Sequence, residues 1–231
     1  MPTSPHVEKH FTGSALVRDV VIGMSDGLTV PFALTAGLSG VLDTNHLIIV
    51  SGVSEIAAGC ISMGLGGFLA GQTEVEHYDA ELKREHDEVE RVPETERKEV
   101  EEIFMSMGVD EALSKQVTLQ ISQDKEKWVD FMMRYELGLD KPDKNRAYQS
   151  AITIALAYLG GGFIPLFPYL VTSNNQHGFY WSCAITILAL LVFGYFKSKV
   201  TGQPLLKGTL KVAFTGILAA AAAYVIAKMI S

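Results

Sequence analysis

The sequence predicts an all-α, polytopic membrane protein with five transmembrane helices and a helical, acidic cytoplasmic domain inserted between the second and third of them. Three observations support this fold. The mean hydropathy of the 231 residues is positive, at +0.22, although the net charge is −7. The charges are segregated, since residues 72–146 hold 21 of the 26 acidic and 12 of the 19 basic residues. Outside this block, five apolar runs are long enough, or nearly long enough, to cross a bilayer.

The five apolar runs differ in their charged residues. A helix needs about 20 predominantly apolar residues to cross the hydrocarbon core. The third and fourth runs contain no charged residue, and the fifth has lysines only near its ends, where long side chains can reach the interfaces. The predicted spans are, roughly, Val20–Leu42, His46–Gly71, Ala147–Thr172, Gly178–Phe196 and Leu205–Ile230.

Lysine and arginine residues set the predicted orientation, because they accumulate in cytoplasmic loops. The loops 43–45 and 173–177 contain neither residue, whereas the loop 197–207 contains three and the acidic block contains twelve. The N-terminus and the acidic domain are therefore predicted to be cytoplasmic, and the C-terminus to lie on the far side of the membrane. The predicted domains are a cytoplasmic N-terminal segment 1–17, the first two transmembrane helices 18–71, the acidic domain 72–145 and the last three transmembrane helices 146–231.

The acidic block is predicted to contain about three helices. Gln72–Arg91 lacks glycine and proline, so it is expected to continue the helix of the second span. Pro93 breaks that helix, and Glu94–Met107 starts a new one. Asp110 is a suitable N-cap for one further helical stretch, Glu111–Leu137.

Two carboxylates lie inside predicted spans, Asp26 in the first and Glu55 in the second. A charged side chain at the centre of a membrane helix costs about 2.5–3.5 kcal/mol on insertion scales, and such residues are usually functional. A structural alternative is that either group is protonated, or is hydrogen-bonded to a helix end.

The surroundings of both carboxylates suit a cation. Pro31 has no N–H to donate, so it frees the carbonyl of Gly27, and Gly23 with Gly27 forms a GxxxG pair that permits close helix packing. Met63 lies two turns after Glu55 in a span rich in small residues. Its thioether would favour a transition metal over Ca²⁺ or Mg²⁺, although most methionines in spans only fill space.

The acidic block contains side chains at spacings that could hold a metal. On a helix, residues three or four apart lie on one face, and mixed carboxylate and thioether ligands suit Fe²⁺ or Mn²⁺ better than Ca²⁺. The alternatives are a solvated face neutralised by nearby lysines and arginines, and a methionine that belongs to an apolar helix face. The candidate pairs are Glu85 and Glu88, Glu96 and Glu99, and Met132 and Glu136.

Several function classes are disfavoured by the sequence. It has one ExxH, Glu74–His77, whereas a ferritin-like di-iron centre needs two. The HExxH, GxxxxGK[ST] and GxSxG motifs are absent, and Cys60 and Cys183 both lie in apolar runs. We therefore expect neither an enzyme nor a prosthetic group. The acidic block also argues against nucleic-acid binding, which needs positive charge.

Arg18–Phe32 (RDVVIGMSDGLTVPF) and Ser54–Gly64 (SEIAAGCISMG) resemble the first two helices of the vacuolar iron transporter family, in its members with a cytoplasmic metal-binding domain. The resemblance extends over nearly the whole chain. It implies a homodimer in the vacuolar membrane, with the translocation path between the two copies of the first helix. It also implies antiport of cytoplasmic Fe²⁺ against lumenal protons, with the C-terminus lumenal. Transport of Mn²⁺, Co²⁺ or Zn²⁺, and a membrane-bound iron buffer or sensor without transport, stay open.

The resemblance assigns roles to residues by their position in these motifs. It makes Asp26 and Met63 the metal ligands of the path, couples Glu55 to protons and places Asp19 near the cytoplasmic mouth. The partners it implies are divalent metal ions, protons, membrane lipid and a second copy of the chain. The cytoplasmic metal ligands that it implies are Glu85, Glu88, Glu96, Glu99, Met132 and Glu136.

Overall fold

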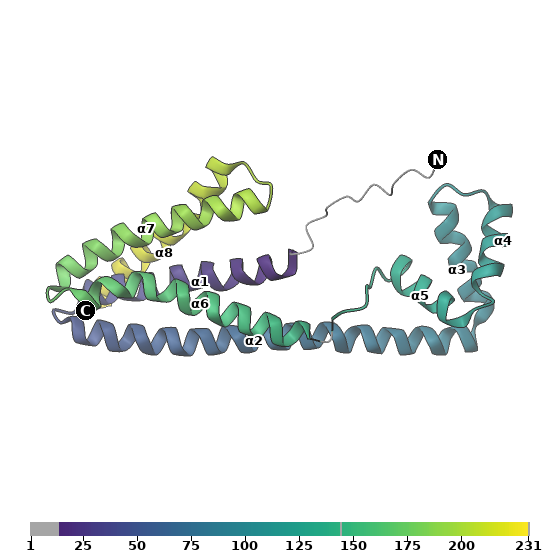
Figure 1. Ribbon diagram of the computed structural model, residues 1–231, viewed down its shortest axis with the longest axis horizontal. Coiled ribbons are helices and arrows are strands. Elements are labelled where there is room, and N and C mark those ends of the chain that lie inside the picture. The colour runs from purple at the N-terminus through teal and green to yellow at the C-terminus, as the bar shows by residue number, and fades with distance from the viewer. Residues whose placement is uncertain (1–13, 144, 231) are drawn as a thin grey trace, which may run out of the picture. The chain divides into compact units, whose positions relative to one another are not determined.

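A computed structural model describes residues 14–143 and 145–230 of the chain. Every regular element of these residues is a helix (Figure 1). The prediction of a cytoplasmic segment over 1–17 falls mostly on residues outside the described part. The helices are α1 (Ser14–Ser39), α2 (Asn45–Arg91), α3 (Pro93–Ser106), α4 (Glu111–Ile121), α5 (Lys125–Tyr135), α6 (Arg146–Val171), α7 (Asn175–Val200) and α8 (Leu205–Ile230).

Five of these helices, α1, α2, α6, α7 and α8, are long and apolar enough to cross a membrane. The predicted all-α fold with five spans is therefore confirmed. The ends of some spans differ from the prediction: α1 begins at Ser14 and not near Val20. Hydropathy detects only the part of a helix that is apolar, whereas the backbone hydrogen bonds continue into polar flanking residues.

Backbone contacts divide the chain into two compact units. The acidic unit is Leu69–Ala147, and the membrane unit consists of Met1–Phe68 and Tyr148–Ser231. The acidic domain was predicted over 72–145. Helix α2 has 47 residues and contributes to both units, so the predicted continuation of the second span into the acidic domain is a single uninterrupted helix.

Glycines let α1 pack closely on α6 in the membrane unit. A Cβ on Gly23 would lie 2.9 Å from the Cβ of Ala157, and one on Gly27 would lie 2.9 Å from the Cα of Tyr158. Both distances are too short for a side chain, so only glycine permits this approach. The GxxxG pair therefore packs two helices of the same chain.

Helix α2 packs on α6 along one face only. A Cβ on Gly67 would lie 2.7 Å from Ile154 Cδ1, so a side chain at this position would require Ile154 to move. On the other face, Val53, Ile61 and Leu65 are exposed. That face of α2 therefore carries large apolar residues that the other described helices of this chain do not cover.

The acidic unit has one more helix than predicted. Glu111–Leu137 was expected to be one helical stretch, but α4 ends at Ile121 and α5 begins at Lys125. The reason is a second N-cap, since the carboxylate of Asp124 accepts a hydrogen bond from the backbone N–H of Lys127 at 3.3 Å. Asp110 caps α4 as predicted. The apolar core of this unit is formed by Tyr78, Val89, Val100, Trp128, Val129, Met132 and Met133.

Candidate metal sites

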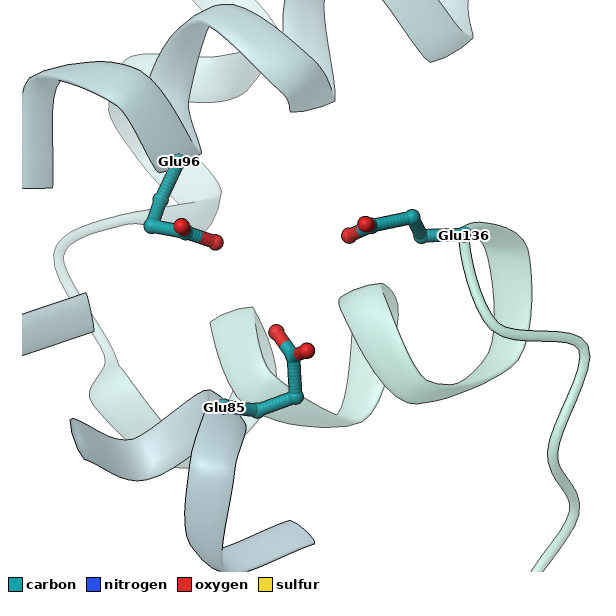
Figure 2. A group of neighbouring side chains, drawn as sticks. All are labelled: Glu85, Glu96 and Glu136. Carbon is teal, nitrogen blue, oxygen red and sulfur yellow. The ribbon is translucent and has the colours of Figure 1, made fainter. Parts of the chain in front are cut away.

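Three glutamates converge in the acidic unit. Glu85 comes from α2, Glu96 from α3 and Glu136 from the end of α5, and each offers an oxygen within 4.8 Å of the others. Figure 2 shows the three carboxylates turned toward a common point. Glu85 and Glu96 are only 1% and 4% exposed, whereas Glu136 is exposed. We call these three residues the glutamate triad.

Helix periodicity explains why the triad forms. Each of its glutamates lies four residues from a member of the apolar core, on the same face of its helix. When that core packs, it carries the three carboxylates to its edge. The pairs are Glu85 with Val89, Glu96 with Val100 and Glu136 with Met132.

Burial and mutual repulsion make the triad retain protons. Burial first, then the charges of Glu136 and Glu88, raises the pKa of Glu85 to about 7. Burial first, then the charge of Glu99, raises the pKa of Glu96 to about 7. Burial also raises the pKa of Glu136. A bound divalent cation would stabilise the deprotonated carboxylates, because it replaces the hydration lost on burial and neutralises the repulsion between them.

The other predicted ligands of this unit lie around the triad. Glu88 and Glu99 are half-buried, and their charges act on Glu85 and Glu96. The guanidinium of Arg84 lies 3.7 Å from the Glu88 carboxylate. Met132 is fully buried in the apolar core, as expected for a methionine that belongs to the apolar face of its helix. The metal-binding roles of all six residues stay predictions.

A second candidate site lies in the membrane unit. Asp26 on α1 and Glu55 on α2 are both half-buried. The hydroxyl of Tyr158, on α6, donates a hydrogen bond to Glu55 Oε1. The second oxygen of Glu55, Oε2, is buried without a hydrogen-bond partner in the described chain.

The sequence interpretation missed Tyr158. A tyrosine near the middle of an apolar span, far from either interface, is the signal that could have identified it, because a buried phenol needs a hydrogen-bond partner. Two glycines leave room for it: Gly27 packs on its backbone, and a Cβ on Gly59 would lie 2.6 Å from its ring carbon Cε1. Tyr158 is only 2% exposed.

Comparison with known proteins identifies the family of this chain. A family model described as the VIT family matches residues 17–228. This chain belongs to the VIT family. It is 49% identical to "Vacuolar iron transporter 1" of Arabidopsis thaliana over 225 residues, which cover 97% of this chain and 90% of the relative. It is 48% identical to the protein of that name from Oryza sativa, over 97% of this chain and 89% of the relative.

A relative from a third organism is more distant in sequence. "Vacuolar iron transporter cccA" of Arthroderma benhamiae is 38% identical over 224 residues, which cover 94% of this chain and 80% of the relative. The resemblance of Arg18–Phe32 and Ser54–Gly64 to vacuolar iron transporters is thereby confirmed. Since the match to the Arabidopsis protein leaves out only a few residues, it takes in the acidic unit as well as the five spans.

The two remaining predicted path residues of this VIT-family chain lie on the helices that carry the carboxylates. Asp19 is 1% exposed, and the Nε of Arg18 lies 3.8 Å from its Oδ1. It precedes Asp26 by seven residues, which places both on one face of α1, about 10 Å apart along the axis. Met63 is half-buried on α2. The transport roles of Asp19, Asp26, Glu55 and Met63 stay predictions.

Proposed function

We propose that this protein exchanges cytoplasmic Fe²⁺ for vacuolar protons across the vacuolar membrane. The observation that carries the proposal is the pair of carboxylates in the membrane unit, of which Glu55 is hydrogen-bonded to Tyr158. Glu55 accepts one hydrogen bond from this residue and keeps a second buried oxygen without a partner. A proton or a cation is the natural partner for such an oxygen. Both relatives are named vacuolar iron transporters, which supports iron as the cargo.

In this mechanism the cation and the proton compete for the membrane carboxylates. Asp26 and Met63 hold the metal as oxygen and thioether ligands, and Asp19 lies two turns before Asp26 on the same face of α1. Carboxylates bind a metal only when deprotonated. An acidic lumen therefore protonates Glu55 and Asp26, weakens the hold on the metal and favours its release. The same ligands suit Mn²⁺, Co²⁺ and Zn²⁺.

The acidic unit is proposed to gather the cargo on the cytoplasmic side. The glutamate triad, with Glu88 and Glu99 beside it and Met132 in the adjoining core, binds the divalent ion, and the field of the acidic unit raises its local concentration. Glu85 Oε2 supports this role, because it is buried without a hydrogen-bond partner in the described chain. No prosthetic group and no enzymatic activity are proposed.

Two further features belong to the proposal. The distribution of lysine and arginine supports a cytoplasmic N-terminus and acidic unit, and a lumenal C-terminus. A homodimer with the path between the two copies of α1 is proposed from the resemblance to the vacuolar iron transporter family.

The test is Fe²⁺ flux into proteoliposomes with an acidic interior, measured under reducing conditions together with proton efflux. We expect Asp26→Asn and Glu55→Gln each to reduce metal-dependent proton flux at least about 100-fold, because each removes a charged group that must be paired in the membrane. Asp43→Asn is the matched control, since it removes an exposed carboxylate from the loop after α1. Undiminished flux in both membrane variants would remove these residues from the mechanism.

A membrane-bound iron buffer or sensor is the second candidate, because the glutamate triad alone would suit binding without transport. The variant E85Q/E96Q discriminates between the two functions. A transporter should retain flux at saturating Fe²⁺ when the acidic unit no longer binds metal, since its path lies in the membrane unit. A protein that binds Fe²⁺ tightly but carries no flux in any form would be a buffer.

A further inference from the structure

A cavity that two lysines and several hydroxyl groups help to line lies beside the turn between α7 and α8. Its volume is about 440 Å³, and α1, α7, α8 and the turn all contribute to its wall. Lys197 is half-buried and Lys211 is exposed. Hydroxyl groups make up most of the remaining polar lining. The residues on which the following argument depends are Ser25, Thr29, Lys197, Ser198, Lys211 and Thr215.

On α7 and α8, every charged residue near this cavity is a lysine. No aspartate or glutamate follows Asp143 in the sequence, so α7, α8 and their turn carry no acidic residue. Two further lysines, Lys199 and Lys207, lie near the same turn. Among the described residues, none of these four lysines forms an ion pair. Two unpaired ammonium groups in one cavity favour an anionic ligand.

The position of the cavity restricts the kind of anion. Because α7 and α8 are both candidate spans, the turn between them lies at a membrane surface, where lipid phosphates are concentrated. A volume of about 440 Å³ exceeds that of a single phosphate and falls in the range of small-molecule sites. Basic pockets between transmembrane helices bind phosphorylated lipid headgroups. Phe196 and Phe214 precede two lining residues, Lys197 and Thr215, in the sequence. Both phenylalanines are exposed and could contact the acyl chains of a lipid.

We infer that this cavity binds the phosphorylated headgroup of an anionic phospholipid, with Lys197 and Lys211 pairing with its phosphates and Ser25 and Thr29 contacting it from α1. Ser25 directly precedes Asp26, and Thr29 follows one turn after Ser25. The bound lipid therefore bridges the helix that carries Asp26 to the α7–α8 hairpin. This inference concerns binding and stands apart from the proposed transport.

The experiment is thermal unfolding of the purified full chain in detergent, titrated with dioctanoyl phosphatidylinositol 4-phosphate. We expect saturable stabilisation by this lipid. In K197Q/K211Q the affinity should fall about 30-fold, as expected for the loss of two lysines near an anionic headgroup. K199Q/K207Q is the matched control, because it removes the same charge from exposed positions outside the cavity lining, and its affinity should stay within about threefold.

Other outcomes would overturn the inference. An equal loss of affinity in K199Q/K207Q would mean diffuse attraction to the whole hairpin. Equal stabilisation by inorganic phosphate at the same concentration would mean a site for the free anion and no lipid site. No stabilisation of the unmodified protein would mean no site. If K197Q/K211Q unfolds without lipid at a lower temperature than the unmodified protein, K197R/K211R, which keeps both charges, should still bind; loss of binding in that variant would also refute the inference.

Discussion

The carboxylates of the acidic unit and those of the membrane unit are held in different ways. Glu85, Glu96 and Glu136 come from separate segments and bring their oxygens within 4.8 Å of one another. Asp26 and Glu55 lie on separate helices of the membrane unit, and Glu55 accepts a hydrogen bond from the hydroxyl of Tyr158. The first arrangement concentrates like charge, whereas the second combines carboxylates with a neutral hydrogen-bond donor.

The difference corresponds to two steps in moving an ion. A site that captures a dilute cation gains from several carboxylates in one place, because each adds attraction. A site on a path must bind well enough to admit the ion but weakly enough to release it. A hydrogen bond from Tyr158 satisfies one oxygen of Glu55, which leaves a single oxygen for a proton or metal. The comparison therefore predicts that changes in one unit affect affinity and changes in the other affect flux.

The largest expected effect is on metal affinity in the acidic unit. E85Q/E96Q should weaken tight Mn²⁺ binding to the full chain at least about 100-fold, because it removes two of the three carboxylate ligands of the triad. The free Mn²⁺ signal in electron paramagnetic resonance measures the bound fraction. E94Q/E102Q is the matched control, since both of its positions are exposed on α3. If that control weakens binding as much, the effect belongs to net charge and the triad is not a site.

A smaller effect is expected from Tyr158. Tyr158→Phe should reduce Fe²⁺ flux about tenfold while Mn²⁺ binding to the acidic unit stays unchanged. The reason is that Glu55 Oε1 loses its donor, and an unpaired buried polar atom costs about 1–3 kcal/mol. Tyr148→Phe is the control on the same helix, because Tyr148 is exposed. Equal flux in Y158F and the unmodified protein would separate this hydroxyl from transport.

Part of this architecture follows directly from the sequence. The five spans were predictable because apolar length is a property of contiguous residues, and Asp110 was a recognisable N-cap because capping is local. The break between α4 and α5 was also local, at Ser122–Asp124, but no glycine or proline marks it. The apolar pattern runs on past Asp124 in Trp128, Phe131 and Met132, so the stretch resembled one amphipathic helix.

The candidate sites depend on contacts between distant residues. Spacing identified Glu85 with Glu88 and Glu96 with Glu99, but it could not tell which member of each pair points inward. Packing decides this, because only Glu85 and Glu96 lie four residues before a buried valine of the core, whose packing carries them together. The contact between Glu55 and Tyr158 joins residues 103 apart in the chain, so no local pattern predicts it.

The smallest expected effect is on the pH dependence of stability in the metal-free acidic unit. Glu85 and Glu96 have pKa values of about 7 in the folded state, above the ordinary value of 4.5. Between these values the folded unit keeps protons that the unfolded chain releases. Its stability therefore falls as the pH rises from about 4.5 through 7 and stays low above that. With a chelator present, we expect the unfolding midpoint to drop by several °C from pH 5 to pH 7.5.

Trp128 provides the measurement, because it is buried in the core of the acidic unit and Trp181 is the only other tryptophan. In a Trp181→Phe background, its fluorescence reports unfolding of this unit. Adding E85Q/E96Q should flatten the pH dependence and raise the midpoint at pH 7.5, because the glutamines relieve the repulsion that a metal would otherwise neutralise. Mn²⁺ should stabilise the unmodified unit but not this variant. If the pH dependence of the midpoint persists in E85Q/E96Q, the titration belongs to other groups, and repulsion within the triad does not lower the stability of the unit.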